Sequence, residues 1–273
     1  MRTLVDEICH FLSENGFEYV ERLHDGHAVI MTGVQYRCVV PYLISSYSPE
    51  EAETAAADIG QLVSDLAKQG ISPIVITEDR WYRQNEMMKS RLLAHLEMFT
   101  PVFARNCKVR KIDKDEASRF LEGNHSYGDA ACRYRYGLSL KKSPETLVAV
   151  ATFSNARKWQ KGDKVIRSYE WTRYASLPEV RVIGGMGKLL KTFIRDVRPD
   201  DVMSYADLEW SEGRVYEQLG FVLEGRKDSV LFEVDGQWCR RPVGKVESMQ
   251  CKPSLYLRNF GSNKYRLKLT EYE

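Results

Sequence analysis

The 273-residue sequence has no Cys-x-x-Cys pair and no apolar run long enough to cross a membrane. Its six cysteines stand far apart, so we expect reduced, mostly buried thiols and neither a metal site nor a disulfide framework. They are Cys9, Cys38, Cys107, Cys132, Cys239 and Cys251. The opening MRTLVDEICHFL carries early acids and no cleavable apolar core. We therefore expect a cytoplasmic protein with no membrane partner.

Charge is close to balanced overall, with a formal net charge of +2, but it is unevenly distributed. Residues 1–100 hold 8 Lys and Arg against 15 Asp and Glu, whereas residues 101–273 hold 32 against 23. This shift and the chain length favour two domains. A basic second part suits an anionic ligand or nucleic acid, and ordinary solvated lysines are the alternative.

A glycine-rich turn before a helix organises the second part of the chain. A strand ending near Ala175 leads to three glycines within 184–187, and apolar residues then recur at helical spacing over 189–194. The first N–H groups of a helix have no intrahelical acceptor, the helix dipole adds positive charge, and glycine lets a phosphate come close. The turn therefore predicts a backbone site for a diphosphate. Tight packing of the helix on the sheet is the alternative explanation.

The elements that follow, a strand at 202–206, a helix around 215–219 and then Gly220-Phe221, complete a recognisable order. This order resembles the core of the GNAT superfamily of acyl-CoA N-acyltransferases. The run from Gly185 to Leu190 is similar to the family's Gly-x-Gly and Leu-Leu motif, with the leucines one place early, and Tyr216 to Phe221 is similar to its Tyr-x-x-x-Gly-Phe motif. The resemblance implies an antiparallel meander whose last strand splays from the next one.

The same resemblance implies acetyl-CoA or another acyl-CoA as co-substrate. Its diphosphate would lie on the segment formed by Ile183, Gly184, Gly185, Met186, Gly187 and Lys188. More closely, stretches from Phe120 to Asp207 look like a GNAT-like domain of phage proteins described as homing-endonuclease-like. That closer match supports the fold more than it supports acetyl transfer.

Acyl transfer to an amine needs a base for the amine and an acid for the departing thiolate. The resemblance places Tyr216 where the family often keeps that acid; packing of its ring under the sheet is the alternative. Glu170 is the best candidate base, because its strand should border the cleft, and a salt bridge to a neighbouring strand is the alternative. Simple alternation would put Glu170, Thr172 and Tyr174 on one face of that strand.

Two further residues are candidates for the acceptor side. Asp207 ends the strand 202–206 at the edge where open sheets place ligands, although it is equally suited to cap the next helix. His125 follows the first helix of this domain, in a loop that GNAT folds bring over the acceptor site. A histidine there could relay a proton or serve as a hydrogen-bonding support.

The first part of the chain predicts a smaller α+β domain, with helices at 3–16 and after the Ser48 cap, an Asp-Gly hairpin, and a helix from Asp79 through Met98. The run from Val75 to Trp81 resembles the last strand and helix of very-short-patch-repair and related homing-type endonucleases. The metal-binding Asp and Glu-x-Lys set of that family is missing here. The resemblance implies a degenerate nuclease-like domain, and a domain that packs or binds a partner is the alternative.

The sequence thus predicts an α/β (α+β) protein, with a GNAT-like mixed sheet and flanking helices preceded by the smaller domain. We expect domains at 1–104 and 105–241, and an extension at 242–273 that packs on the second. Within the second domain we expect a helix capped by Asp113, strands at 133–140, 146–153 and 167–175, and a basic loop at 155–164. The function implied is an acyl-CoA-dependent N-acyltransferase with a small-molecule or protein amine as acceptor. The alternative is a catalytically silent GNAT-like module in a nucleic-acid-associated protein.

Overall fold

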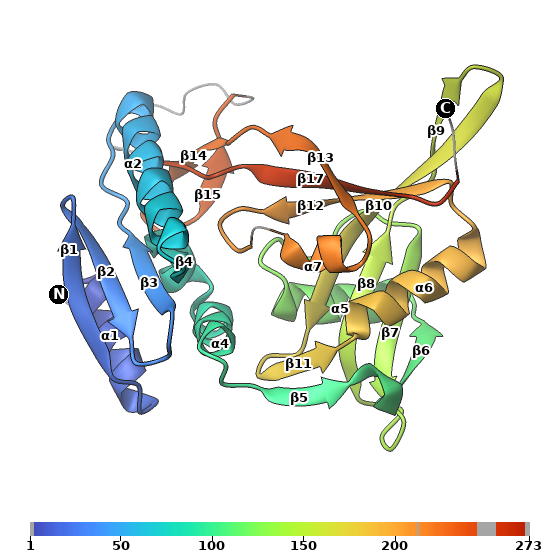
Figure 1. Ribbon diagram of the computed structural model, residues 1–273, viewed down its shortest axis with the longest axis horizontal. Helices are drawn as coiled ribbons and strands as arrows, with labels where there is room; N and C mark the ends of the chain where they lie inside the picture. The colour runs from blue at the N-terminus through green and yellow to red at the C-terminus, as the bar shows by residue number, and fades with distance from the viewer. Residues whose placement is uncertain (1–2, 212, 245–254, 271–273) are drawn as a thin grey trace. The chain divides into compact units, whose positions relative to one another are not determined.

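The computed structural model describes residues 3–211, 213–244 and 255–270, which form two compact units (Figure 1). The described part of the first unit consists of 3–96, 207–211, 227–244 and 255–262, and that of the second of 97–206, 213–226 and 263–270. Each unit is therefore built from segments far apart in the sequence. None of the helices in the described ranges combines the length and apolarity needed to cross a bilayer.

The first unit contains a four-stranded sheet in the order β1-β2-β3-β4 and a small sheet in the order β15-β14-β16. Strands β1 to β3 are antiparallel and β4 is parallel to β3. The bounds are α1 Leu4–Glu14, β1 Tyr19–His24, β2 His27–Thr32, β3 Arg37–Tyr42, α2 Pro49–Lys68, β4 Ser72–Thr77, α3 Glu78–Arg83, α4 Asn85–His95, β14 Leu231–Val234, β15 Arg240–Pro242 and β16 Leu255–Arg258.

Two apolar cores hold the first unit. One joins Leu4, Ile8 and Leu12 of α1 to the sheet and to α3 and α4, and the other joins α2 to the sheet and to β16. The Ser48 side chain accepts from the N–H of Glu51, so the predicted cap of α2 is confirmed. The predicted helix from Asp79 through Met98 is wrong, since Gln84 leaves helical geometry with φ −124° and ψ 41° and separates α3 from α4.

The second unit contains an eight-stranded mixed sheet in the order β13-β17-β12-β10-β8-β7-β6, with β9 paired to β10. Its bounds are β5 Thr100–Phe103, η1 Ala104–Asn106, β6 Cys107–Lys111, α5 Lys114–Asn124, β7 Tyr134–Leu140, β8 Leu147–Phe153, β9 Arg157–Lys161, β10 Lys164–Ser176, β11 Val180–Ile183, α6 Gly185–Val197, β12 Asp201–Asp207, α7 Arg214–Gln218, β13 Val222–Lys227 and β17 Ser262–Lys268.

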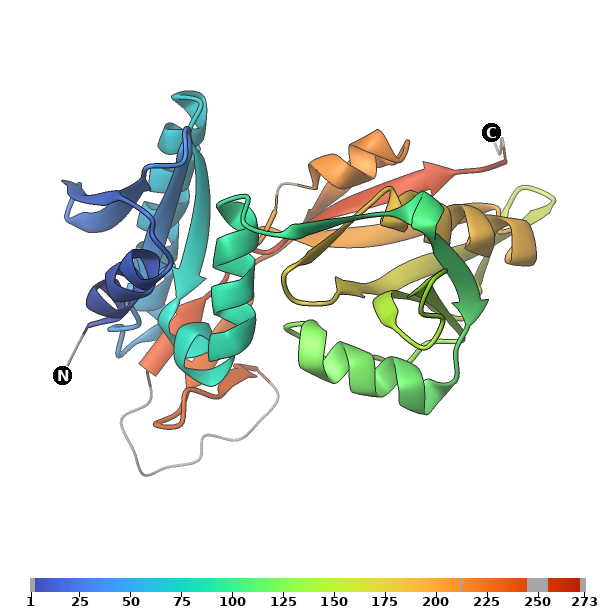
Figure 2. The ribbon, with the colours of Figure 1, turned by 90° about the horizontal axis from the view of Figure 1, so that it is seen from below.

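Helices cover both faces of this sheet (Figure 2). Helix α6 packs Leu189, Leu190 and Phe193 on one face, where the Phe193 ring stacks on Phe153 at 3.9 Å between centroids. Helix α5 packs on the other face through Ala117, Phe120 and Leu121, and its predicted Asp113 cap is confirmed by a bond from the Glu116 N–H. The predicted fold class, a mixed α/β sheet with flanking helices beside a smaller α+β region, is confirmed.

The strands β6, β7, β8 and β10 form the predicted antiparallel meander. The predicted loop at 155–164 is wrong, because Arg157–Lys161 is strand β9 and forms a hairpin with the extended start of β10. The segment just before the predicted domain boundary at residue 104 is strand β5, which pairs in parallel with β11. Each strand is only four residues long and its partner lies some eighty positions away, so the sequence alone did not predict the pair.

The C-terminal segments divide between the units. Strands β15 and β16 belong to the small sheet of the first unit, whereas β17 enters the large sheet between β13 and β12. The predicted domain ranges 1–104, 105–241 and 242–273 therefore differ from the compact units, because residues after 226 contribute to both. Cys9, Cys38 and Cys107 are buried, Cys132 and Cys239 are partly exposed, and Cys251 lies outside the described residues.

Candidate functional site

The glycine turn connects β11 to α6 and leaves the helix N-terminus without a side-chain cap. Gly184 occupies the cap position in the left-handed region at φ +74°, and its carbonyl accepts from the Lys188 N–H at 3.1 Å. In the part of the chain that the structure describes, the N–H groups of Gly185, Met186 and Gly187 have no acceptor. Backbone donors and the positive end of the helix dipole therefore remain available for an anion.

The three glycines of the turn serve different purposes. Gly184 is exposed, and a Cβ there would contact only the Cβ of Ala104 at 3.7 Å. A Cβ on buried Gly185 would lie 2.8 Å from Val182 Cγ1, and one on Gly187 would lie 3.2 Å from Leu219 Cδ2. Open approach to the backbone is thus a property of Gly184, whereas Gly185 lets α6 pack closely on β11.

The other residues of this segment are held by the protein itself. The Lys188 ammonium donates to the carbonyls of Ala104 at 2.8 Å and Cys107 at 2.6 Å, so its charge is directed at the turn η1. Met186 packs against the core of the second unit, and the Ile183 side chain is 43% exposed. An anion at this turn would therefore be bound by backbone N–H groups more than by Lys188.

The pairing between β10 and β12 ends early, and we call the place where the two strands part the opening. The two strands pair in parallel for three residues only, and the last pair joins Glu170 to Met203. Beyond that point the Ser204 hydroxyl donates to the Trp171 carbonyl at 3.0 Å, replacing a backbone bond between the strands. The splay that the family resemblance implies is present at this position.

Tyr216 of helix α7 lies at this opening. Its hydroxyl is 2.9 Å from the Ser204 Oγ, and its ring stacks on Tyr265 and lies edge-on to Trp171. Burial raises the pKa of Tyr216, so the phenol stays protonated over the physiological range. The Tyr216 ring is packed against the core, as one interpretation of the sequence proposed. Its hydroxyl lies where β10 and β12 part, as the other interpretation, a proton donor, requires.

Glu170 is the last residue of β10 that pairs with β12. Its backbone N–H donates to the Ser154 Oγ at 2.9 Å, and its carbonyl accepts from the Ser154 N–H at 2.9 Å. The carboxylate is partly exposed and, within the described ranges, has neither a hydrogen bond nor an ion pair. A salt bridge to a neighbouring strand, the alternative explanation of Glu170, is absent from those ranges, and the cation that attracts the carboxylate electrostatically is Arg173 of the same strand.

The predicted alternation of side chains along β10 is wrong. The register with β8 shifts between Trp171 and Arg173, so Thr172 is the extra residue of a β-bulge. Tyr174 consequently lies on the same face as Trp171, with an edge-on ring contact at 6.2 Å, and not with Glu170. Arg173 turns toward the loop after α5, where its Nε donates to the Gly128 carbonyl at 3.1 Å.

His125 begins that loop, directly after helix α5. Its Nδ1 accepts from the Tyr127 N–H at 3.1 Å and its carbonyl accepts from the Gly128 N–H at 2.8 Å. These bonds shape the turn, and the bond from Arg173 to Gly128 attaches the turn to β10. His125 thus lies in a loop that is hydrogen-bonded to the strand carrying Glu170. Its Nδ1 is the acceptor of a hydrogen bond within that loop.

Asp207 lies in the first unit and takes part in a buried ion cluster. Its Oδ1 accepts from the Glu209 N–H at 3.0 Å, and its Oδ2 is 3.8 Å from Arg80. Arg80 also contacts Glu209 at 2.9 Å, while Arg240 holds Asp79 at 2.5 Å and 2.7 Å and Glu209 at 3.1 Å. The structure therefore brings Glu170 and Tyr216 to the opening, but places Asp207 among residues that stabilise the first unit.

The acids of the nuclease-like run are likewise used internally. Glu78 accepts from the Ile44 N–H at 2.9 Å, Asp79 is held by Arg240, and the Trp81 indole donates to Glu7 at 2.8 Å. Over the described residues, His, Cys, Asp and Glu form no group of three or more that could hold a metal ion.

Two residues of the opening carried no predicted role. Ser204 bridges the splayed strands and Ser154 fixes the backbone of Glu170. Ser204 is a small buried hydroxyl on strand β12, and its contrast with the apolar neighbours Val202 and Met203 is the signal that the sequence offered.

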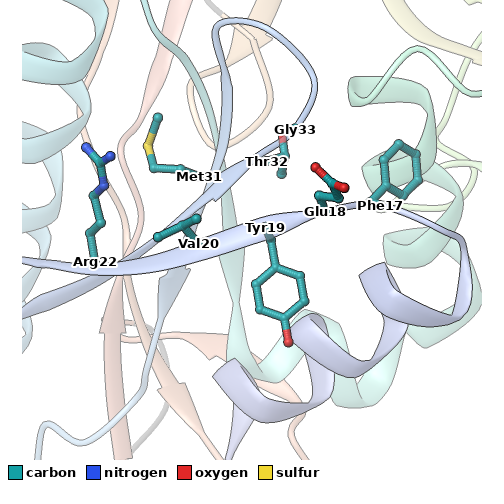
Figure 3. A pocket seen from close by; sticks show the side chains of 8 residues that line it. All are labelled: Phe17, Glu18, Tyr19, Val20, Arg22, Met31, Thr32 and Gly33. Atoms are coloured by element: carbon teal, nitrogen blue, oxygen red, sulfur yellow. The ribbon is translucent and has the colours of Figure 1, made fainter.

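Two hollows of the surface lie in the first unit. One, of about 460 Å³, is bordered by the ends and outer side of β1 and β2 (Figure 3). It is lined by Phe17, Glu18, Tyr19, Val20, Arg22, Met31, Thr32 and Gly33. The other, of about 640 Å³, is lined by residues around Ser46 and the start of α2. Neither contains a residue of the predicted site.

No protein-family model and no curated protein matches the chain. Among solved structures it is similar to the NatC complex bound to Gag peptide and CoA, at 14% identity and a TM-score of 0.38, covering 60% of this chain and 99% of the other. It is similar to Arabidopsis thaliana NAA60 in complex with acetyl-CoA, at 9% identity and a TM-score of 0.37 over 60% and 99%. A GNAT-family acetyltransferase from Bacillus anthracis is similar at 12% identity and a TM-score of 0.34 over 60% and 95%.

Proposed function

We propose that the second unit is an acyl-CoA-dependent N-acyltransferase module that acylates an amine. The observation that carries the proposal is the pairing of two features on one sheet: strands that splay after Glu170 and Met203, and a helix N-terminus whose N–H groups have no acceptor within the described residues. A Cβ at Gly187 would lie 3.2 Å from the side chain of Leu219, in the segment that follows Tyr216, so the turn and the proposed acid lie on neighbouring elements. The coenzyme itself is inferred from the sequence resemblance.

In this proposal the N–H groups from Gly185 to Gly187 hold the coenzyme diphosphate. The site fits such a group because Gly184 is exposed and has no side chain. Even an added Cβ would meet only the Ala104 Cβ, at 3.7 Å, so the backbone can be approached closely. The helix dipole contributes about half a positive charge at this end, so a diphosphate is favoured without a dedicated basic side chain. When bound, an acyl-CoA supplies an activated acyl group as a thioester.

The chain's own groups account for the proton balance. Glu170 takes a proton from the amine, the amine nitrogen forms the amide bond as the carbon–sulfur bond breaks, and Tyr216 returns a proton to the sulfur. Ser204 holds the Tyr216 hydroxyl in place, and its own hydroxyl donates a hydrogen bond to the Trp171 carbonyl. Burial of Tyr216 keeps this acid protonated at neutral pH.

Transfer from acetyl-CoA to a panel of amines, followed by mass spectrometry, tests the proposal. We expect acetylated product with the native chain, a loss of turnover of about 100-fold or more in Glu170→Gln, and a smaller loss in Tyr216→Phe. Thr172→Ser is a matched control on the same strand and should retain turnover. Coenzyme binding with no product from peptide, polyamine or aminoglycoside acceptors would contradict catalysis.

A second candidate function is a catalytically silent GNAT-like module in a nucleic-acid-associated protein. One observation favours it: three successive carbonyls of β10 at the splay are already bonded by side chains. Ser204 donates to Trp171, Arg173 Nη1 donates to Thr172 at 2.9 Å, and the Trp171 indole donates to Arg173 at 3.0 Å. A ligand that paired with this edge would have to displace those bonds, so absence of both binding and turnover would support this candidate.

A further inference from the structure

A basic two-stranded ribbon projects from the large sheet of the second unit (Figure 1). Strand β9 pairs with the first five residues of β10, from Lys161 opposite Lys164 to Arg157 opposite Ser168. The turn between them is Gly162-Asp163, with Gly162 at φ +57°, and the Gln160 amide donates to the Gly162 carbonyl at 2.6 Å. The paired strands and the bonded turn make a defined hairpin. We call residues 157–168 the basic ribbon.

Positive charge is concentrated along the basic ribbon. Every residue of β9 is exposed. The ribbon carries five cations against one acid, Asp163; they are Arg157, Lys158, Lys161, Lys164 and Arg167, of which Arg167 is paired with Asp200. The register places Lys161 directly opposite Lys164. Like charges in directly opposed positions destabilise an isolated strand pair. A bound polyanion would offset the repulsion between these two lysines.

The cations lie on both faces of the ribbon. Alternation along β9 places Arg157, Trp159 and Lys161 on one face and Lys158 and Gln160 on the other. The pairing adds Lys164 to the first of these faces, beside Lys161, and Val165 to the second, beside Gln160. A partner with negative charge on two opposite walls matches this arrangement better than a flat anionic surface.

Apolar side chains are interleaved with the charges. Trp159 is 39% exposed and Val165 is 54% exposed, one on each face. Such side chains suit contact with sugars and base edges between rows of phosphates. The tip itself is Gly162-Asp163, polar and acidic, which is unsuited to insertion into a lipid surface.

We propose that the basic ribbon binds double-stranded DNA by lying in the major groove. The major groove of B-form DNA, about 12 Å wide, admits a two-stranded β-ribbon. With the ribbon standing edge-on in the groove, the side chains of its two faces point toward the two phosphate walls, because successive side chains of a strand leave on opposite faces. The deep, narrow major groove of an A-form RNA duplex does not admit such a ribbon. This inference is independent of the proposed acyl transfer.

Fluorescence anisotropy with a short labelled DNA duplex, measured over a range of salt concentrations, tests the inference. The triple variant Lys158→Gln, Lys161→Gln, Lys164→Gln removes three proposed phosphate contacts. We expect its slope of log K against log salt to be shallower by about 3 and its affinity at about 0.1 M salt to fall about 100-fold.

A matched triple variant, Lys114→Gln, Lys141→Gln, Lys142→Gln, removes the same charge from exposed positions elsewhere in the same unit. It should retain native affinity and slope. Asp163→Lys adds a cation at the tip and should tighten binding, a gain that loss of folding cannot imitate. All variants are compared by circular dichroism on the full chain.

Four results would overturn the inference. They are no DNA binding by the native chain at low salt, equal losses in the two triple variants, equal affinity for an RNA duplex, and tighter binding to vesicles containing phosphatidylserine than to DNA. The RNA result would mean contact with phosphates outside the groove. The vesicle result would assign the ribbon to a membrane surface.

Discussion

Replacement of Gly185 by alanine should destabilise the second unit through lack of space. The added Cβ would lie 2.8 Å from Val182 Cγ1, 3.0 Å from Val182 Cβ and 3.3 Å from Leu138 Cδ1. Overpacking of a buried position costs about 1–3 kcal/mol, whereas Gly to Ala in a helix gains at most about 1 kcal/mol. We expect a net loss of about 1–2 kcal/mol, which lowers the thermal midpoint of this unit by about 2–8 °C.

Scanning calorimetry measures the midpoint, and hydrogen exchange of the amides in α6 assigns the loss to this helix. A matched comparison separates lack of space from backbone strain. At Gly184, with φ +74° and open space around it, Asn should be tolerated better than Ala, since Asn visits the left-handed region more readily. At Gly185 the larger Asn should be worse than Ala. The roles assigned to the two glycines are refuted if Ala is as stable as Asn or more stable at Gly184, or if Asn is as stable as Ala or more stable at Gly185.

Three further predictions follow from buried polar groups. Ser204→Ala leaves the Trp171 carbonyl and the Tyr216 phenol without the Ser204 hydroxyl and should lower the free energy of unfolding by about 1–3 kcal/mol, which is more than Tyr216→Phe. Urea unfolding measures both losses, and a larger loss in Tyr216→Phe would contradict this. Arg240→Leu leaves buried acids unpaired and should destabilise the first unit by about 3–5 kcal/mol, again by urea unfolding, and an unchanged midpoint would contradict it. Burial lowers the pKa of His95 from 6.5 to about 4, so the unfolded chain binds the extra proton and about 3 kcal/mol of stability is lost as the pH falls from 6.5 to 4. His95→Gln should flatten that part of the pH profile of stability, and an unaltered profile would exclude His95 as its source.

The sequence predicted best where local chemistry determines the structure. Ser48 and Asp113 cap their helices because a short polar side chain reaches the N–H three residues on. The helix after the glycine turn was predicted from the helical spacing of its apolar residues. The strands of the meander were predicted from the alternation of apolar and polar residues. Glu170 was named because its strand follows from this pattern, whereas Tyr216 was named from the family resemblance.

Features that depend on contacts between distant segments could not be predicted. Strands β5 and β11 pair across some eighty positions of sequence, and β9 is a polar, fully exposed strand with no apolar period. The bulge at Thr172 depends on the register with β8 and reversed the expected side of Tyr174. Asp207 looked like a ligand-site residue because its partners Arg80 and Glu209 cannot be paired with it from sequence alone.

Calorimetric titration with acetyl-CoA tests the diphosphate site at the glycine turn most directly, using two variants that differ only in charge. Gly184→Asn and Gly184→Asp have the same shape and both tolerate the left-handed backbone. We predict binding by the native chain and by Gly184→Asn, and weakening by about tenfold or more in Gly184→Asp, whose carboxylate repels the diphosphate. Absence of heat from the native chain at millimolar acetyl-CoA, or equal affinities of the two variants, would contradict a coenzyme site on these amides.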